Sequence, residues 1–134
     1  MRPQLCVLVV HISEAPWENL SHALKAAGVT LCRARSCHEA KYLIEELQPE
    51  VVFSEPELPD GNWQRVLGMA ERAAPPTNVI VVGKHHDMQL YVSAVDQGAY
   101  DFIAPPFAVH DISHMLCCAM DNAHWRRFEH ASAA

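Results

Sequence analysis

Short apolar stretches recur along this chain at regular intervals, and they limit the possible folds more than any other feature. Five segments, residues 5–10, 29–34, 51–53, 79–82 and 100–103, are short and rich in β-branched or aromatic side chains. The first and the fourth are apolar throughout, a pattern typical of strands that are covered on both faces in a parallel sheet. The pattern predicts five strands.

An amphipathic helix is expected after each strand, because apolar residues recur there at helical spacing. Ser36, followed three residues later by Glu39, forms a capping-box sequence, and Asn62 and Asp87 are further N-cap residues. Gly98 is typical of the residue that follows a helix end. The predicted helices span residues 16–27, 37–48, 62–73, 87–97 and 109–128.

Strands that alternate with helices through short loops close only as a parallel sheet with helices on both faces. We therefore expect an α/β protein of the flavodoxin-like (βα)₅ class, a three-layer sandwich whose five-stranded parallel sheet has the strand order 2-1-3-4-5. In such folds ligands bind outside the carboxyl ends of the strands. Function should then depend on residues 11–14, 54–59, 83–86 and 104–107.

One domain accounts for the 134 residues, since a single hydrophobic core typically serves roughly 100–150 residues. We expect its core over about residues 5–127 and a frayed tail or linker over residues 128–134. With 50% hydrophobic and 19% charged residues, the composition excludes intrinsic disorder. The net charge of −6 disfavours direct nucleic-acid binding, and no apolar stretch approaches the roughly 20 residues that cross a membrane. We therefore expect a cytoplasmic protein with neither nucleic acid nor membrane as a partner.

Cysteines and histidines form no recognisable metal motif. The five cysteines include no CxxC pair, and the nine histidines are scattered along the chain. No motif brings a nucleophile and a base together either. We expect reduced thiols, no bound metal and no enzymatic activity.

Three segments resemble the receiver domains of two-component response regulators, the CheY-like superfamily. They are residues 49–61 (PEVVFSEPELPDG), residues 77–82 (TNVIVV) and residues 97–107 (QGAYDFIAPPF), and the resemblance extends over residues 5–127. It implies the same fold and a role in phosphorelay signal transduction, in which a receiver takes a phosphoryl group on an aspartate.

The residues that carry phosphoryl transfer in that family do not match here. At the phosphoacceptor position this chain has Glu55, and at the two acidic positions that hold Mg²⁺ it has His11 and Ile12. The Thr or Ser of the family's switch corresponds to Gly83, and the lysine that pairs with the phosphate corresponds to Pro105. Phosphoryl transfer depends on positioning and charge neutralisation. The resemblance therefore implies a degenerate receiver, or pseudo-receiver, that lacks the acceptor Asp and does not bind Mg²⁺.

The aromatic switch position is retained as Phe102, without a hydroxyl. Glu55 is one methylene longer than Asp, and we hypothesise that its negative charge partly imitates a phosphorylated aspartate. Its candidate partners at the same edge of the sheet are His11 and Lys84. The alternative is that Glu55 is a solvated loop carboxylate and that His11 hydrogen-bonds the backbone.

The resemblance implies a protein-protein interaction or dimerisation module that works without phosphorylation. Its expected surface combines the fourth helix, the fifth strand and the last helix, and includes Tyr91, Val95, Tyr100 and Phe102. The expected partner is a second copy, another protein or an output domain of a larger regulator.

Two other functions are compatible with the sequence. The first is an active receiver that is phosphorylated at a displaced residue such as Asp60 or Ser54. The second is a flavodoxin-like domain that binds a small ligand or cofactor, although the loop at residues 11–16 contains one Ser and no Gly to hold a phosphate.

Overall fold

Strands and helices alternate along the chain as the sequence pattern predicts. The computed structural model describes residues 6–15 and 17–133, and it describes only the backbone of residues 130–133. The predicted strand start at Leu5 and helix start at Pro16 fall outside these residues. The elements are β1 (Cys6–Val10), α1 (Trp17–Ala26), β2 (Thr30–Ala34), α2 (Cys37–Leu47), β3 (Val51–Ser54), β4 (Glu57–Leu58), β5 (Gly61–Asn62), α3 (Trp63–Arg72), β6 (Asn78–Val82), α4 (Met88–Asp96), β7 (Asp101–Ile103) and α5 (Val109–Ala133).

The main sheet is parallel and has the strand order β2-β1-β3-β6-β7. In the centre, Val7 of β1 lies beside Leu31 of β2 and Val51 of β3. Because β6 and β7 are the fourth and fifth strands of this sheet along the chain, the order is the predicted 2-1-3-4-5. The flavodoxin-like α/β fold is confirmed.

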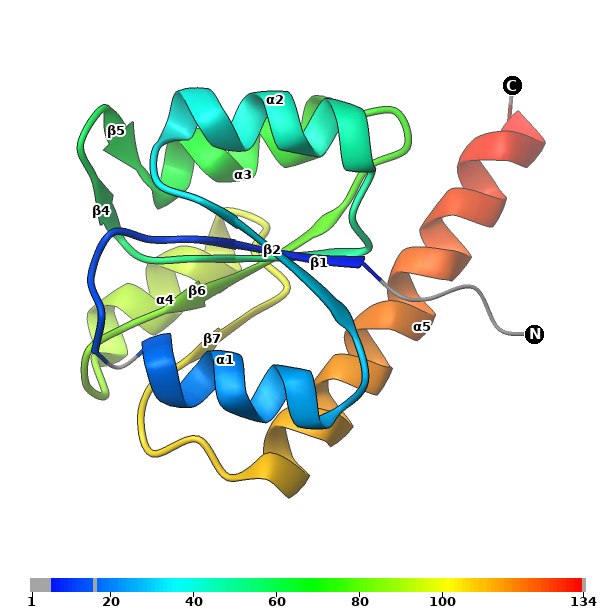
Figure 1. Ribbon diagram of the computed structural model, residues 1–134. Helices are drawn as coiled ribbons and strands as arrows, with labels where there is room; N and C mark the ends of the chain where they lie inside the picture. The colour runs from blue at the N-terminus through cyan, green and yellow to red at the C-terminus, as the bar shows by residue number, and fades with distance from the viewer. Residues whose placement is uncertain (1–5, 16, 134) are drawn as a thin grey trace.

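Helices cover both faces of the sheet (Figure 1). One core cluster joins the sheet to α2, α3 and α4 and includes Leu8 and Val81, whereas the other joins it to α1 and α5 and includes Val7 and Ile80. Successive residues of a strand point to opposite faces, so each central strand supplies both clusters. This explains why the central strands are apolar throughout.

The predicted helix caps are present. The side chains of Ser36, Asn62 and Asp87 accept hydrogen bonds from backbone N–H groups in the first turns of α2, α3 and α4, respectively. After α4, Gly98 has a φ of +109°, a backbone conformation that L side chains rarely adopt. These local signals explain where the helices begin and why α4 ends.

Two local features differ from the predicted pattern. Residues 57–62, for which no strand is predicted, form a short antiparallel hairpin of β4 and β5. In addition, α5 continues to Ala133, so most of the predicted frayed tail is helical. Arg127 of α5 donates from Nη2 to the carbonyls of Gln48 (2.9 Å) and Pro49 (2.8 Å). These bonds hold the end of the helix against the loop that precedes β3.

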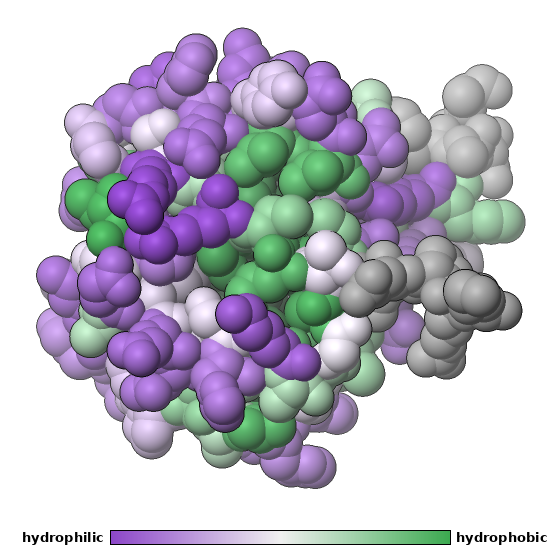
Figure 2. Space-filling view, in the orientation of Figure 1, coloured by the Kyte–Doolittle hydropathy of each residue, from purple (hydrophilic) through white to green (hydrophobic). Residues whose placement is uncertain are grey.

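The edge strand β2 crosses the face of the molecule that Figures 1 and 2 show. Its first four residues are each partly exposed, and β1 is its one neighbour in the sheet as described. Figure 2 shows apolar surface in the middle of this face, with polar surface above and below it. This exposure is expected of an edge strand, which lacks a covering neighbour on one side.

Candidate functional site

A cavity of about 710 Å³ opens at the carboxyl ends of the strands, where the fold predicts the functional residues. The loop after β1 contributes Ile12 and Ser13, the loop after β3 contributes residues 55–57, and the loop after β6 contributes residues 83–85. The first turn of α4 and Trp63 of α3 complete the lining. The topology therefore brings together three of the four segments that the sequence analysis singled out.

Glu55 is buried in the wall of this cavity and is only 5% exposed. Its Oε1 atom accepts hydrogen bonds from the backbone N–H groups of Ile12, at 2.6 Å, and Ser13, at 3.3 Å. Its own N–H donates to the carbonyl of Val10 at 3.0 Å. Glu55 is therefore not a solvated loop carboxylate, because the β1 loop binds it with backbone donors.

The backbone donors were missed because sequence reasoning compared side chains. His11 and Lys84 were the expected partners, but neither forms a hydrogen bond or ion pair with Glu55 in the part of the chain that the structure describes. The positions of the two strands could have predicted these backbone donors. Because β1 and β3 are neighbours in a parallel sheet, a residue that follows β3 lies beside the first peptide groups that follow β1.

His11 faces the α1 side of the sheet and does not line the cavity. Its ring stacks on Trp17 with a centroid separation of 4.3 Å and an interplanar angle of 2°. Its Nδ1–H donates to the carbonyl of Ser13 at 2.7 Å, as the backbone-bonded alternative expected. Burial lowers the pKa of His11 below its usual value, which favours the neutral ring.

Lys84 is exposed and lines the rim of the cavity. Pro105, the expected counterpart of the family's lysine, does not line the cavity and has no side-chain donor. Lys84 is therefore the one Lys or Arg among the described lining residues.

Gly83 makes room for Phe102. A Cβ atom built on Gly83 would lie 2.7 Å from Cζ and 2.9 Å from Cε2 of the Phe102 ring, closer than real Cβ contacts. The N–H of Gly83 also donates to the carbonyl of Ile103 at 2.9 Å. The ring thus occupies space that any side chain at position 83 would need.

Neither displaced acceptor faces the cavity. Ser54 is fully buried, and its Oγ–H donates to the carbonyl of Glu55 at 3.0 Å. The Asp60 carboxylate accepts from the backbone N–H groups of Cys37 (2.7 Å) and His38 (3.0 Å) at the start of α2. These hydrogen bonds lower the pKa of Asp60, which acts as a second cap of that helix.

The cavity residues do not suit Mg²⁺, which needs near-octahedral oxygen ligands. His11 and Ile12, which the resemblance places at the acidic positions, have no carboxylate, and His11 faces the α1 side of the sheet. Within the described residues, no three His, Cys, Asp or Glu side chains are arranged to hold a metal ion. The described residues thus offer no preformed set of three such ligands for a metal ion.

The expected interaction surface needs correction at two of its four residues. Tyr91 and Val95 of α4 are exposed as predicted, at 43% and 44%. Phe102 is buried, because its ring packs on Gly83 and meets Tyr91 edge-to-face at 6.2 Å. Tyr100 is partly buried in the core cluster on the α1 and α5 side, and this burial raises the pKa of its hydroxyl.

Sequence reasoning also missed part of this surface. Met88 and Val92 of α4 are exposed beside Tyr91 and Val95, whereas Ala94 is the one fully buried residue of the helix. The signal was a second apolar stripe at helical spacing on the outer side of α4. A cavity of about 450 Å³ continues this surface between α4, β7 and α5.

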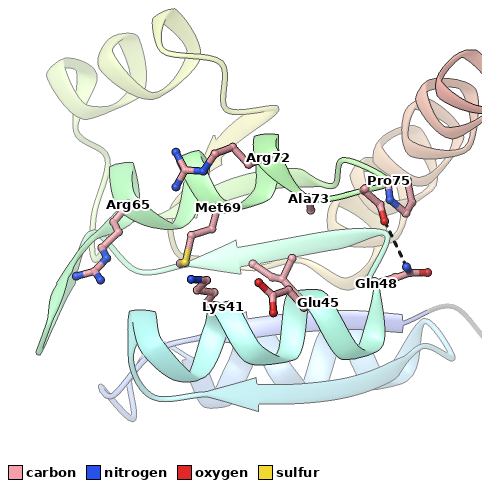
Figure 3. Close-up of a pocket in the computed structure, with 10 residues that line it drawn as sticks. Lys41, Glu45, Gln48, Arg65, Met69, Arg72, Ala73 and Pro75 are labelled. Atoms are coloured by element: carbon pink, nitrogen blue, oxygen red, sulfur yellow. Dashed lines mark hydrogen bonds between the residues drawn. The ribbon is translucent and has the colours of Figure 1, made fainter. Parts of the chain in front are cut away.

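A separate groove, of about 410 Å³, lies between α2 and α3 (Figure 3). Lys41 and Glu45 of α2 lie opposite Met69 of α3, and Arg65 and Arg72 add two further cations to its lining. The groove shares no lining residue with the cavity around Glu55. It is therefore a separate feature of the α2 and α3 layer.

Known proteins share this sequence pattern and fold. The sequence model of the response regulator receiver domain matches residues 7–117. The DNA-binding transcriptional regulator NtrC of Salmonella typhimurium is 28% identical over 92 residues, which are 69% of this chain and 20% of NtrC. The chain thus spans about a fifth of the length of that relative.

Solved structures agree with this match. A beryllofluoride-activated NtrC4 receiver domain dimer is 29% identical with a TM-score of 0.76, over 88% of this chain and 98% of that one. NtrX from Brucella abortus is 24% identical with a TM-score of 0.79, over 98% of this chain and 30% of that one. At that lower identity, the likeness to NtrX concerns the fold alone.

Proposed function

The chain belongs to the response regulator receiver domain family, and we propose that it is an atypical member. It takes part in two-component signal transduction without being phosphorylated, as a protein-protein interaction or dimerisation module. The observation that carries this proposal is the environment of Glu55, whose Oε1 atom is already bound by two backbone N–H groups. No acceptor Asp, metal-ligand set or phosphate-pairing lysine accompanies it among the described residues.

The packing of Phe102 supports a single signalling conformation. Its ring is 8% exposed and fills the space over Gly83, which has no hydroxyl to bind a phosphoryl oxygen. A phosphoryl group could therefore form no hydrogen bond with a side chain at position 83, and the Phe102 ring would not be displaced by such a bond. We propose that the Glu55 carboxylate and the buried Phe102 ring together hold the domain in one state.

The outer surface of α4 supports the interaction role. Met88, Tyr91, Val92 and Val95 expose apolar side chains, and the adjoining cavity extends to β7 and α5. Apolar patches of this kind on small domains often mark protein interfaces. The similar NtrC4 receiver domain is described as a dimer, and we propose a second copy, another protein or an output domain of a larger regulator as the partner here.

The remaining expectations stay predictions. We propose that the domain is not an enzyme, binds no Mg²⁺ and does not bind nucleic acid directly. A cytoplasmic location is also a proposal. None of the described helices is both long and apolar enough to cross a membrane.

Exposure to a small phosphodonor tests the proposal. The purified chain is incubated with acetyl phosphate, with and without Mg²⁺, and its intact mass is measured before peptide mapping. We expect an unchanged mass under both conditions. A stoichiometric, Mg²⁺-dependent adduct on Glu55 would contradict the proposal, whereas an adduct on Asp60 or Ser54 would favour the displaced acceptor.

A typical receiver treated in parallel provides the positive control. The variant Glu55→Asp adds a second comparison, because it restores the acceptor residue and leaves His11, Ile12 and Gly83 as they are. We expect this variant to stay unmodified as well. Efficient labelling of it would show that the acceptor alone separates this chain from active receivers.

A further inference from the structure

We infer that the cavity around Glu55 binds an organic cation, an alkylammonium or alkylguanidinium group, with the Glu55 carboxylate as its counter-charge. This inference rests on the proposed function, in which the cavity is free of phosphoryl chemistry. The second carboxylate oxygen of Glu55 is the group that would bind this cation. An ionised carboxylate offers about four lone-pair positions. Oε1 uses two of them, whereas Oε2 forms no hydrogen bond within the described part of the chain.

The Glu55 residue is buried, whereas its free Oε2 atom is open to the cavity and is available to a ligand there. Glu55 is 95% buried, since its exposed fraction is 5%, and it lines the cavity. A buried carboxylate is costly unless hydrogen bonds and an opposite charge compensate it. The two backbone donors supply part of this compensation, and the described residues supply no ion pair. A positively charged donor in the cavity would supply the rest.

The charges around the cavity favour a cation. Glu57 and Asp87 line it together with Glu55, and Lys84 is the one lysine or arginine among the lining residues that the structure describes. Asp87 uses Oδ1 to cap α4, yet its negative charge remains beside the cavity. Three carboxylates against one ammonium give the site a negative potential that attracts cations.

The walls favour an organic cation over a bare metal ion. Ile12, Pro56, Trp63 and Leu90 give the cavity apolar surface, and its volume of about 710 Å³ is in the usual range for small-molecule sites. Hard metal ions require six or more oxygen ligands, whereas an ammonium or guanidinium group needs only a few acceptors. A ligand with a short apolar stem and one such cationic group matches the lining, because the stem can contact the apolar walls and the cation can pair with the carboxylates.

Two sources could present this chemistry: a free amine, or a Lys or Arg side chain of a partner protein. n-Butylguanidine, which carries one cationic group on a short apolar stem, serves as the probe for the first source. A capped Leu-Arg-Leu peptide serves for the second, with the neutral citrulline peptide as its control. Each is titrated into ¹⁵N-labelled protein, and the amide signals are followed by NMR. No phosphodonor is present, so the result is independent of the phosphorylation test.

We expect saturable shifts at the amides of Ile12, Ser13, Glu55 and Glu57 with at least one probe. The isosteric variant Glu55→Gln keeps an oxygen for the backbone donors and removes the charge, and should weaken binding about tenfold or more. Glu46→Gln, on the exposed side of α2, is the matched control and should leave the affinity unchanged. A thermal unfolding curve verifies that each variant is folded.

Lys84 provides a further discriminating variant. Lys84→Met removes the competing ammonium at the rim and should strengthen binding a few-fold. Weaker binding in this variant would show that Lys84 helps to form a site of another kind and would overturn the inference. No saturable shift with either probe would also overturn it, as would equal affinities of the Glu55→Gln and wild-type proteins.

Discussion

The Phe102 ring can occupy its position because Gly83 has no side chain. Glycine is often chosen for backbone freedom, but Gly83 does not have a positive φ. Its role is to leave space, because the Phe102 ring lies where a Cβ atom would be. The family resemblance placed Phe102 on the outer surface, and this single contact explains why it is buried instead.

Gly83→Ala should destabilise the protein by about 1–3 kcal/mol, the usual range for overpacking a filled site. Urea unfolding measures the change. In a Phe102→Leu background the same substitution should cost clearly less, because the ring atoms that the new methyl group meets are absent. Equal costs in both backgrounds would contradict the steric explanation.

Gly68→Ala is the matched control for this substitution. A Cβ at Gly68 would meet Arg72 at 3.5 Å, an ordinary contact, and the residue lies inside α3. We expect a stabilisation of roughly 0.5–1 kcal/mol from the better helix propensity of alanine.

His11 links stability to pH. Its folded-state pKa is lowered below the usual 6.5, chiefly by burial, so the folded protein favours the neutral ring. The stability that the neutral ring contributes is fully present above pH 6.5 and is lost as the pH falls from there toward the folded-state pKa. His11→Gln should therefore lose less stability than the wild type between pH 7.5 and pH 5.5, about one unit on either side of the ordinary histidine value.

Urea midpoints at the two pH values measure this difference. His22→Gln, at an exposed position of α1, is the control and should keep the wild-type pH dependence. If His11→Gln also kept it, the buried ring would not be the group that titrates.

At the scale of elements, α2 illustrates how a helix start is stabilised from two directions. Ser36 caps it locally, as the sequence predicts, by accepting from the N–H of Glu39 at 3.0 Å. Asp60 caps it from the β4–β5 hairpin, more than twenty residues further along the chain. The second cap also keeps the Asp60 carboxylate away from the cavity, which argues against a displaced phosphoacceptor there.

Asp60→Ala should lower the free energy of unfolding by about 1 kcal/mol, the typical value for a lost N-cap. The pKa of Asp60 is lowered from 3.8 by the backbone donors of Cys37 and His38, so its contribution is present above that value. It is lost as the pH falls through the lower, folded-state pKa. Chemical unfolding at pH 7 and at pH 3 measures both effects, and a variant as stable as the wild type at pH 7 would contradict the capping role.

At the scale of the whole molecule, the fold followed from the sequence and much of the site did not. Helix starts follow from short-range patterns such as the cap at Ser36, and the strand order follows from the alternation of strands and helices and the rules of the fold class. The partners of Glu55 could not be read in this way, because Ile12 lies 43 residues away and donates from its backbone. The burial of Phe102 depends likewise on a tertiary contact with Gly83. Side-chain identity predicts positions in a fold better than it predicts which backbone groups meet there.

The outer surface of α4 gives the most direct prediction for the intact molecule. Val95→Glu places a carboxylate at the C-terminal end of the apolar strip formed by Met88, Tyr91, Val92 and Val95, which is exposed in the free domain. Because Val95 is 44% exposed, the substitution should change the stability of the monomer by less than about 0.5 kcal/mol. In a dimer formed through α4, β7 and α5, the same carboxylate would be buried without a partner, which should weaken association at least about tenfold.

Sedimentation equilibrium of the wild type and the variant over a range of concentrations measures this association. Tyr42→Glu is the matched control, since Tyr42 is 61% exposed on α2, on a different part of the surface. We expect Tyr42→Glu to associate like the wild type and Val95→Glu to be monomeric. If Tyr42→Glu dissociated the dimer and Val95→Glu did not, the interface would lie on the α2 side. A wild type that stayed monomeric at all concentrations would leave α4 as a surface for a different protein, because its apolar side chains would still lack a partner.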